Sequence, residues 1–321
     1  MNRKPHPQVA ELLSTVFKAT PGAGAPSVEQ MRTTNDEIFA PLIGPGEVVA
    51  RVWDEVVSRC GEGVPVRCYQ PGEAKPELTI LYVHGGGWVT GTIESYDVLC
   101  RSLALRANGL VVSIDYDLSP EQRFPRALEQ VLAVVRAMSA RCTEIGSELT
   151  IAGDSAGAQL VGAALHRLAA GNETLPSAAA FIYPVADAKM GNQSWDELGE
   201  GFRLTRSVMQ WYWEQYIGCS FVELQERAME PEVSPLQSPL LGSYPRSLVV
   251  TAELDPLSGE GAELAARLAA AGTETEHIEV PGQIHGFLRF RRALTDTQWG
   301  ADAVMTRIAG FLNARQPLQC D

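Results

Sequence analysis

The sequence contains no long apolar run: no stretch of its 321 residues approaches the ~18 consecutive apolar residues that a membrane-spanning helix needs. Residues 1–7 carry positive charge, but a mixed polar and apolar segment follows them instead of the continuous apolar core of a secretory signal. We therefore expect a cytoplasmic protein with no membrane partner.

Basic side chains are also few, with 26 Lys and Arg against 39 Asp and Glu and a net charge of −13. The field of an acidic protein repels polyanions, so the composition argues against nucleic acid as a partner. Neutral or cationic small molecules are the guests that this charge favours.

The six cysteines are scattered and form no Cys-x-x-Cys pair. An even cysteine count in a chain of this length does not predict a disulfide framework. The glycine run after Val83 lacks the Lys-Ser/Thr of a phosphate-binding loop, and no residues have the spacing of a metal site. We therefore predict no metal and no cofactor.

Apolar, β-prone runs alternate with helical patterns along most of the chain. The pattern predicts strands at 78–83, 110–115, 149–151, 178–183, 247–251 and 276–280, and helices near 95–107, 125–139, 156–170, 258–271 and 299–313. This rhythm indicates an α/β fold, with a doubly wound, mostly parallel sheet and helices on both faces. Residues 47–69 add two antiparallel strands around a glycine-rich turn.

Two segments interrupt or precede this rhythm. Residues 1–45 contain two short helical patterns and form an N-terminal arm. Residues 187–241 are rich in aromatic side chains and too long for a simple connection, so they indicate an inserted helical cap. The catalytic core then consists of residues 46–186 and 242–321.

A serine between two glycines follows the predicted strand at 149–151, in the run Gly153-Asp154-Ser155-Ala156-Gly157. This is a Gly-x-Ser-x-Gly strand-to-helix turn. The serine in such a turn adopts a crowded backbone conformation, and side chains at the two glycine positions would collide across the turn. We predict that the Ser155 hydroxyl stands at the end of the sheet as a nucleophile.

An acid and a base follow two later strands, in the chain order serine, acid, histidine. Asp255 comes after the strand at 247–251 and His285 after the strand at 276–280. Because ligands bind at the carboxyl ends of parallel strands, these side chains are expected to meet Ser155. The imidazole would take the serine proton, and the carboxylate would fix its tautomer. Glu253 and Asp187 are the competing acids.

A glycine run, Gly85-Gly86-Gly87, follows His84 at the end of the predicted strand 78–83. Backbone amides without obstructing side chains stabilise the negative charge that develops on a carbonyl oxygen under attack. We predict an oxyanion hole from this run and the amide of Ala156, with Gly86 as first choice. His84 is expected to hold the loop through its imidazole.

Four motifs together resemble one family, the bacterial hormone-sensitive-lipase-like esterases. They are His84-Gly85-Gly86-Gly87-Trp88, Gly153-Asp154-Ser155-Ala156-Gly157, Asp255-Pro256-Leu257 and His285-Gly286-Phe287. The resemblance implies an α/β-hydrolase core, a cap built from the arm and the insertion, and ester hydrolysis without a cofactor. One departure is Asp117, which stands where the family usually has arginine, and it makes a substrate transferred from relatives less certain.

The walls of the pocket are predicted from aromatic and apolar residues near the motifs. The candidates are Trp88, Phe202, Leu204 and Phe287, although packing alone also accounts for the cap aromatics. Residues 289–292 contain three arginines, for which a solvated face is the ordinary interpretation; the resemblance places this edge near a homodimer contact.

These observations predict a serine carboxylesterase that acts on small to medium neutral acyl esters through an acyl-enzyme. One alternative is an amidase, N-deacetylase or lactonase that uses the same three residues on a different acyl bond. Another is a non-catalytic small-molecule receptor. Receptors of this fold commonly lose one of the three residues, whereas Ser155, Asp255 and His285 are all present.

Overall fold

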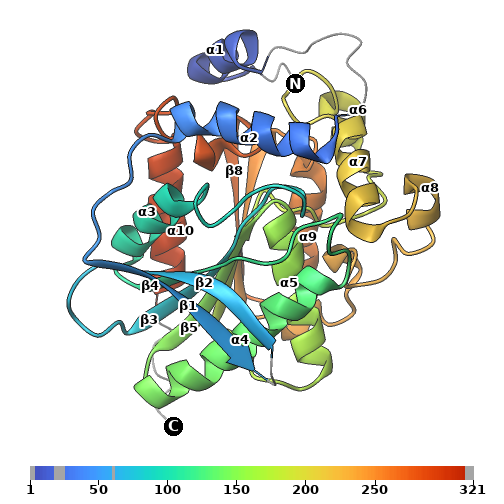
Figure 1. Ribbon diagram of the computed structural model, residues 1–321. Coiled ribbons are helices and arrows are strands. Elements are labelled where there is room, and N and C mark those ends of the chain that lie inside the picture. Colours follow the sequence, from blue (N-terminus) through green and yellow to red (C-terminus); the bar gives the residue numbers. More distant parts are fainter. Residues whose placement is uncertain (1–3, 18–25, 60–61, 315–321) are drawn as a thin grey trace.

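An eight-stranded sheet crosses the molecule in the strand order β1-β2-β4-β3-β5-β6-β7-β8 (Figure 1). The computed structural model describes residues 4–17, 26–59 and 62–314. The first two strands, β1 (Arg51–Arg59) and β2 (Glu62–Gln70), are antiparallel to each other, and β2 is antiparallel to β4. All further neighbours are parallel. The predicted α/β fold with a mostly parallel sheet is confirmed.

The other strands are β3 (Leu78–Val83), β4 (Leu110–Ile114), β5 (Glu148–Asp154), β6 (Ala178–Ile182), β7 (Arg246–Leu254) and β8 (Thr275–Ile284). The helices of the core are α3 (Asp97–Ala107), α4 (Arg126–Ile145), α5 (Ala156–Ala170), α9 (Ser258–Ala270) and α10 (Ala301–Asn313).

Three strands, β5, β7 and β8, extend beyond the ranges that their apolar runs predict. The ladder of β5 continues to Asp154, which pairs with Ile182, because backbone pairing needs no apolar side chain. The last strand, β8, passes through Pro281 and Gly282 beside a register shift between Ala252 and Leu254. A bulge of this kind accommodates a proline that has no N–H to give to the ladder.

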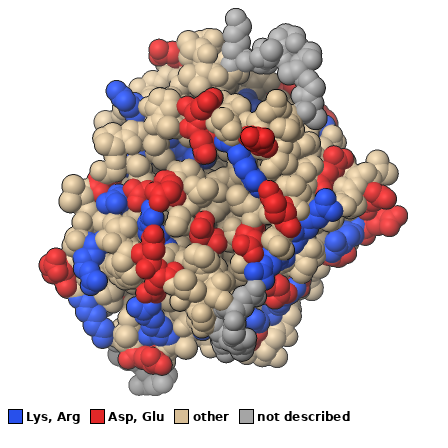
Figure 2. Space-filling model, in the orientation of Figure 1, with Lys and Arg blue, Asp and Glu red and all other residues tan. Residues whose placement is uncertain are grey.

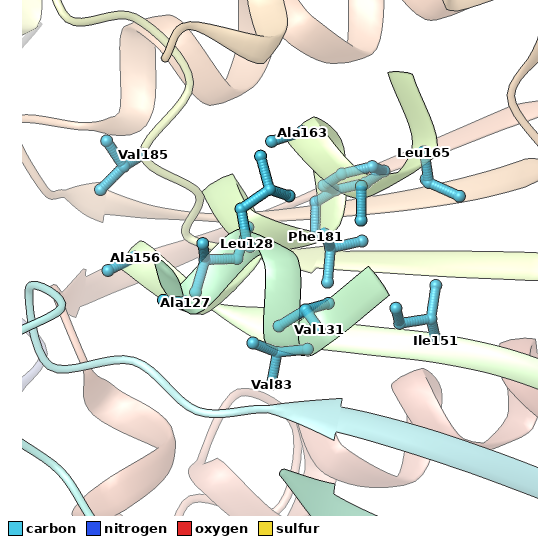
Figure 3. Close-up of a cluster of buried hydrophobic side chains, with 14 of the residues drawn as sticks. Val83, Ala127, Leu128, Val131, Ile151, Ala156, Ala163, Leu165, Phe181 and Val185 are labelled. Atoms are coloured by element: carbon cyan, nitrogen blue, oxygen red, sulfur yellow. The ribbon is translucent and has the colours of Figure 1, made fainter. Parts of the chain in front are cut away.

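The hydrophobic core consists of two layers, one on each face of the sheet. On β3, Leu81 and Val83 belong to one layer with residues of α4, α5 and α9, whereas Ile80 and Tyr82 belong to the other with residues of α3 and α10. Figure 3 shows part of the first layer, where side chains of α4 and α5 meet those of the strands. Successive side chains of β3 enter opposite layers because neighbouring residues of a strand point to opposite faces of the sheet.

The arm and the insertion lie at one end of the molecule (Figure 1). The arm forms α1 (Pro7–Thr15) and α2 (Val28–Ile43), and the insertion forms α6 (Gln193–Leu198), α7 (Arg206–Ile217) and α8 (Phe221–Leu224). The helix α2 begins with a capping box in which Ser27 and Gln30 bond each other's backbone amides.

A buried carboxyl group on α9 anchors the start of the insertion. Glu260 Oε1 accepts hydrogen bonds from the amides of Ala186 (2.8 Å) and Asp187 (3.3 Å), and Oε2 accepts one from Trp195 Nε1 at 3.1 Å. Glu260 is completely buried, and burial raises the pKa of its carboxyl group to about 8. The insertion is therefore joined to the core by a group that is protonated at neutral pH.

Acidic and basic side chains are interspersed over the face shown in Figure 2, with no continuous basic area. Cys68, Cys100, Cys142 and Cys219 are free thiols. Within the described part of the chain, no helix has the length and apolarity to cross a membrane.

Candidate active site

Ser155 occupies a strained turn between β5 and α5, with φ of 55° and ψ of −121°. A non-glycine residue in this region costs on the order of 1–3 kcal/mol. A Cβ atom at Gly153 would lie 2.6 Å from the backbone of Gly157, as predicted, whereas one at Gly157 would lie 2.0 Å from the carbonyl oxygen of Val83. The second glycine is thus required by the neighbouring strand and not by the turn itself.

Ser155, His285 and Asp255 form a chain of hydrogen bonds across three strand ends. The Oγ atom of Ser155 lies 2.9 Å from His285 Nε2, and His285 Nδ1 lies 2.7 Å from Asp255 Oδ2. The Leu257 amide donates to Asp255 Oδ1 at 2.9 Å, which orients the carboxylate. Asp255 is fully buried, and His285 is 6% exposed. The predicted meeting of these three side chains is confirmed.

The two competing acids lie elsewhere. Glu253 accepts a hydrogen bond from the Gly282 amide at 2.7 Å. Asp187 accepts one from the Lys189 amide at 3.2 Å, and burial raises the pKa of the Asp187 carboxyl group. Among the described residues, only Asp255 bonds His285 through a carboxylate.

Two of the three glycines in the loop after β3 line the site. Gly86 and Gly87, with φ of 119° and 61°, line the same cavity as Ser155. The Gly85 amide instead donates to Asp154 Oδ1 at 2.8 Å, so the prediction that Gly85 contributes to the oxyanion hole is wrong. The Ala156 amide is the first of α5, where an N–H has no partner inside the helix.

Asp154 lines the cavity next to Ser155, although none of the site predictions included it. Its Oδ1 atom also accepts from the hydroxyl of Tyr82 (2.9 Å), and Oδ2 accepts from that of Tyr96 (3.0 Å). Burial raises the pKa of this carboxyl group, and these hydrogen bonds oppose the rise. The signal in the sequence is an acidic residue directly before the nucleophile, at the end of a strand buried on both faces.

His84 holds the glycine loop from the other side. Its Nδ1 atom lies 2.8 Å from the Gly85 carbonyl oxygen, and its ring stacks on that of Tyr116 with centroids 4.2 Å apart. Burial lowers the pKa of His84 to about 4, so the imidazole is neutral at pH 7 and donates from Nδ1. The expectation that His84 fixes this loop is confirmed.

A cavity of about 290 Å³ lies above Ser155 and His285. Its walls come from three parts of the chain: the arm supplies Ile38 and Phe39, the insertion Leu204 and Tyr212, and the core Tyr96. The arm and the insertion therefore complete a site whose reactive groups belong to the core.

Only one of the four predicted wall residues, Leu204, lines this cavity within the described part of the chain. Trp88 is fully buried, stacks on Tyr216 with centroids 4.3 Å apart, and donates from Nε1 to Gln159. Phe287 is also fully buried in the second core layer, and Phe202 packs against that layer. The prediction is wrong for these three residues because a sequence position next to a motif does not fix the direction of a side chain.

Asp117 lies away from the cavity, and Arg289 differs from expectation. Asp117 pairs with Arg126, whose Nε lies 2.7 Å from Asp117 Oδ2, and it does not line the cavity. Arg289 is 3% exposed and lines the cavity, so the expected solvated face is wrong for this residue, although Arg292 is exposed. Among the described residues, no group of three or more His, Cys, Asp and Glu has the geometry to hold a metal ion.

The sheet, the strained serine turn and the hydrogen-bonded serine, histidine and aspartate define an α/β hydrolase. A family model described as alpha/beta hydrolase fold matches residues 80–289. The chain belongs to this family and, within it, to the hormone-sensitive-lipase-like carboxylesterases.

Known relatives include an ethyl acetate hydrolase of Pseudomonas putida, 30% identical over 88% of this chain and 90% of its own length. The carboxylic ester hydrolase LipN of Mycobacterium tuberculosis is 34% identical over 78% of this chain and 68% of its own. The structure of a hyperthermophilic esterase from Pyrobaculum calidifontis superposes with a TM-score of 0.86 at 27% identity, covering 97% of this chain and 98% of the other.

Proposed function

We propose that the protein is a serine carboxylesterase that hydrolyses small to medium acyl esters through an acyl-enzyme. The observation that carries this proposal is the hydrogen-bonded chain from Ser155 through His285 to Asp255. Ser155 and His285 line one cavity together with Gly86 and Gly87. The named esterases among the relatives support ester hydrolysis as the reaction.

In the first half of the reaction, Ser155 Oγ attacks the ester carbonyl carbon while His285 Nε2 takes the hydroxyl proton. The bond from His285 Nδ1 to Asp255 keeps the proton on Nδ1, which leaves Nε2 free to accept. The amides of Gly86, Gly87 and Ala156 hold the oxyanion that forms. When the intermediate collapses, the alcohol leaves with the proton from His285.

In the second half, a water molecule attacks the acyl group on Ser155. His285 now takes a proton from water, and the same amides stabilise the second oxyanion. Release of the carboxylic acid restores the Ser155 hydroxyl. Both halves use one base and one oxyanion site, so no cofactor enters the reaction.

A series of p-nitrophenyl esters of increasing acyl length tests this proposal. We expect turnover of the short esters and loss of nearly all activity in Ser155→Ala, by about 10⁴-fold or more. Ser207→Ala, at an exposed position on α7, is the matched control and should keep wild-type rates. Absence of hydrolysis by the folded wild-type protein would support the receptor alternative.

Comparing the rates on an ester and an amide of the same acyl group distinguishes esterase activity from amidase activity. We expect p-nitrophenyl acetate to react far faster than p-nitroacetanilide, because the amide carbonyl is less electrophilic and its nitrogen leaving group departs less readily than p-nitrophenolate. Faster turnover of the anilide would assign the site to amide bonds instead.

A further inference from the structure

Two arginine side chains lie at the wall of the catalytic cavity. Arg203 comes from the loop before α7, and Arg289 comes from the short helix η3 (Phe287–Arg289) that follows the catalytic histidine. Both guanidinium groups lie over the ring of Phe39, with Cζ atoms 4.9 Å and 3.5 Å from its centroid. The two cations are therefore close neighbours.

Neither guanidinium group has an ionic partner among the described residues. Arg203 donates one hydrogen bond, from Nη1 to the carbonyl oxygen of His285 at 3.2 Å. Arg289 is 3% exposed, and its Nε atom is buried without a hydrogen-bond partner. Burial, together with the neighbouring Arg289, lowers the pKa of Arg203. A buried cation without a partner is costly, so the cavity favours an anion at this place.

Burial raises the pKa of the nearby Asp154 and the charge of Arg289 acts to lower it, but no hydrogen bond or ion pair joins the two side chains among the described residues. Asp154 is the only acidic residue among those described at the cavity wall. Its two oxygens are already bonded to the Gly85 amide and to the hydroxyls of Tyr82 and Tyr96. Arg289 Nε is buried and Arg203 Nη1 donates to His285, but the other guanidinium nitrogens of the pair have no hydrogen-bond partner among the described residues, and a guest can bind these.

The arginine pair lies close to His285 and in the same cavity as Ser155. A Cβ atom at Gly286 would lie 3.2 Å from Arg203 Nη1, so this guanidinium group covers the backbone next to His285. Ser155 and the two arginines line the same cavity, so an ester bound at Ser155 shares that cavity with both guanidinium groups. Guanidinium groups recognise carboxylates with charge-assisted, often bidentate, hydrogen bonds.

We propose that Arg203 and Arg289 bind a carboxylate group of the substrate, so that esters bearing a free carboxylate, such as half-esters of short dicarboxylic acids, are preferred over neutral esters. This inference rests on the proposed esterase function and deepens it. It also reverses an expectation from composition, because the local charge of the cavity wall is positive although the whole chain carries a net charge of −13.

The test compares esters that carry either a carboxylate or the uncharged amide of the same shape. Hydrolysis is followed by titrating the acid that is released. Monoethyl glutarate against ethyl glutaramate places the carboxylate on the acyl side, and 4-acetoxybutanoate against 4-acetoxybutanamide places it on the alcohol side. We expect kcat/KM to favour the carboxylate by about tenfold or more in at least one pair. The pair that shows the preference identifies the side of the ester that faces the arginines.

Variants then assign the preference to its source. Arg289→Gln and Arg203→Gln should reduce the ratio to nearly one, because the rate on the carboxylate-bearing ester should fall much further than the rate on the amide-bearing ester. Arg289→Lys should retain part of the preference. Arg206→Gln is the control, because Arg206 pairs with Asp196 on the cap and does not line the cavity. Its ratio should equal that of the wild type.

Two results would overturn the inference: equal wild-type rates within both pairs, or arginine variants that slow both members of a pair equally. If a variant does not fold, inhibition of the wild type decides, since glutarate should compete with p-nitrophenyl butyrate and glutaramide should not. Hydrolysis of p-nitrophenyl butyrate without any charge preference leaves the esterase proposal standing and refutes only this one. No hydrolysis of any ester refutes both.

Discussion

The Gly85 amide donates a 2.8 Å hydrogen bond to the carboxylate of Asp154, and this bond joins the glycine loop to the residue before the nucleophile. Because Asp154 and Ser155 are consecutive, the same bond sets the distance between Ser155 and the amides of Gly86 and Gly87. One buried carboxylate thus positions two parts of the site that belong to different strands.

We expect Asp154→Ala to lower kcat by about 10²–10³-fold, because the oxyanion donors would lose their position. It should also reduce the free energy of unfolding by a few kcal/mol, since it leaves the Gly85 amide and the hydroxyls of Tyr82 and Tyr96 unpaired. Asp154→Asn keeps one acceptor oxygen and should retain more activity. Steady-state kinetics with p-nitrophenyl butyrate and denaturant unfolding measure both effects; an unchanged kcat in folded Asp154→Ala would contradict this role.

Asp255→Asn should reduce kcat by about 10⁴-fold, because an amide at this position no longer holds the His285 proton on Nδ1. Glu253→Gln is the matched control: Glu253 is the other acid at the end of β7, and its only hydrogen bond within the described ranges comes from the Gly282 amide. Its kcat should change by less than about threefold. Equal losses in the two variants would show that Asp255 is not specifically coupled to His285.

Gly86→Ala should abolish most of the activity. A Cβ atom at this position would lie 2.1 Å from the carbonyl oxygen of Thr90, and φ of 119° is unfavourable for any side chain. The loop would have to move, and with it an oxyanion donor, which costs about 10²-fold or more in kcat. Gly72→Ala serves as the control, because a Cβ atom there has nothing within 4 Å; its activity and melting temperature should be those of the wild type.

The raised pKa of Glu260 predicts that the free energy of unfolding depends on pH. The unfolded carboxyl group loses its proton near pH 4.5, whereas the folded one keeps it up to about pH 8. The native state then binds more protons in this window, so stability falls as pH rises from 4.5 to 8, by at most roughly 5 kcal/mol. Urea unfolding between pH 5 and pH 8 should show this fall in the wild type relative to Glu260→Gln.

The control for this experiment is Glu263→Gln, on the same helix. The pKa of Glu263 is lowered, with its bonds to Asn192 and Arg267 outweighing burial. Such a group contributes stability that is lost only as pH falls below about 4.5. Its removal should leave the slope between pH 5 and pH 8 unchanged, and a slope in the wild type no different from that of Glu260→Gln would refute the pKa assigned to Glu260.

Local patterns in the sequence were enough to predict the sheet and the reacting groups. Near-continuous apolar runs correspond to strands buried on both faces, and Ser155 and Asp255 each follow such a strand. His285 follows β8, whose first half is partly exposed. Parallel strands bring their carboxyl ends to one edge. The meeting of residues 130 positions apart therefore follows from topology.

The residues that line the pocket could not be predicted from such patterns. Trp88 and Phe287 belong to the motifs yet are buried in the core. Arg289 lies in an arginine-rich segment yet is buried at the cavity wall. The direction of a side chain depends on backbone angles and on the neighbours that pack against it. The sequence alone determined which chemistry meets at the sheet edge; only the tertiary structure decided what surrounds it, because the arm, the insertion and the core each supply part of one wall.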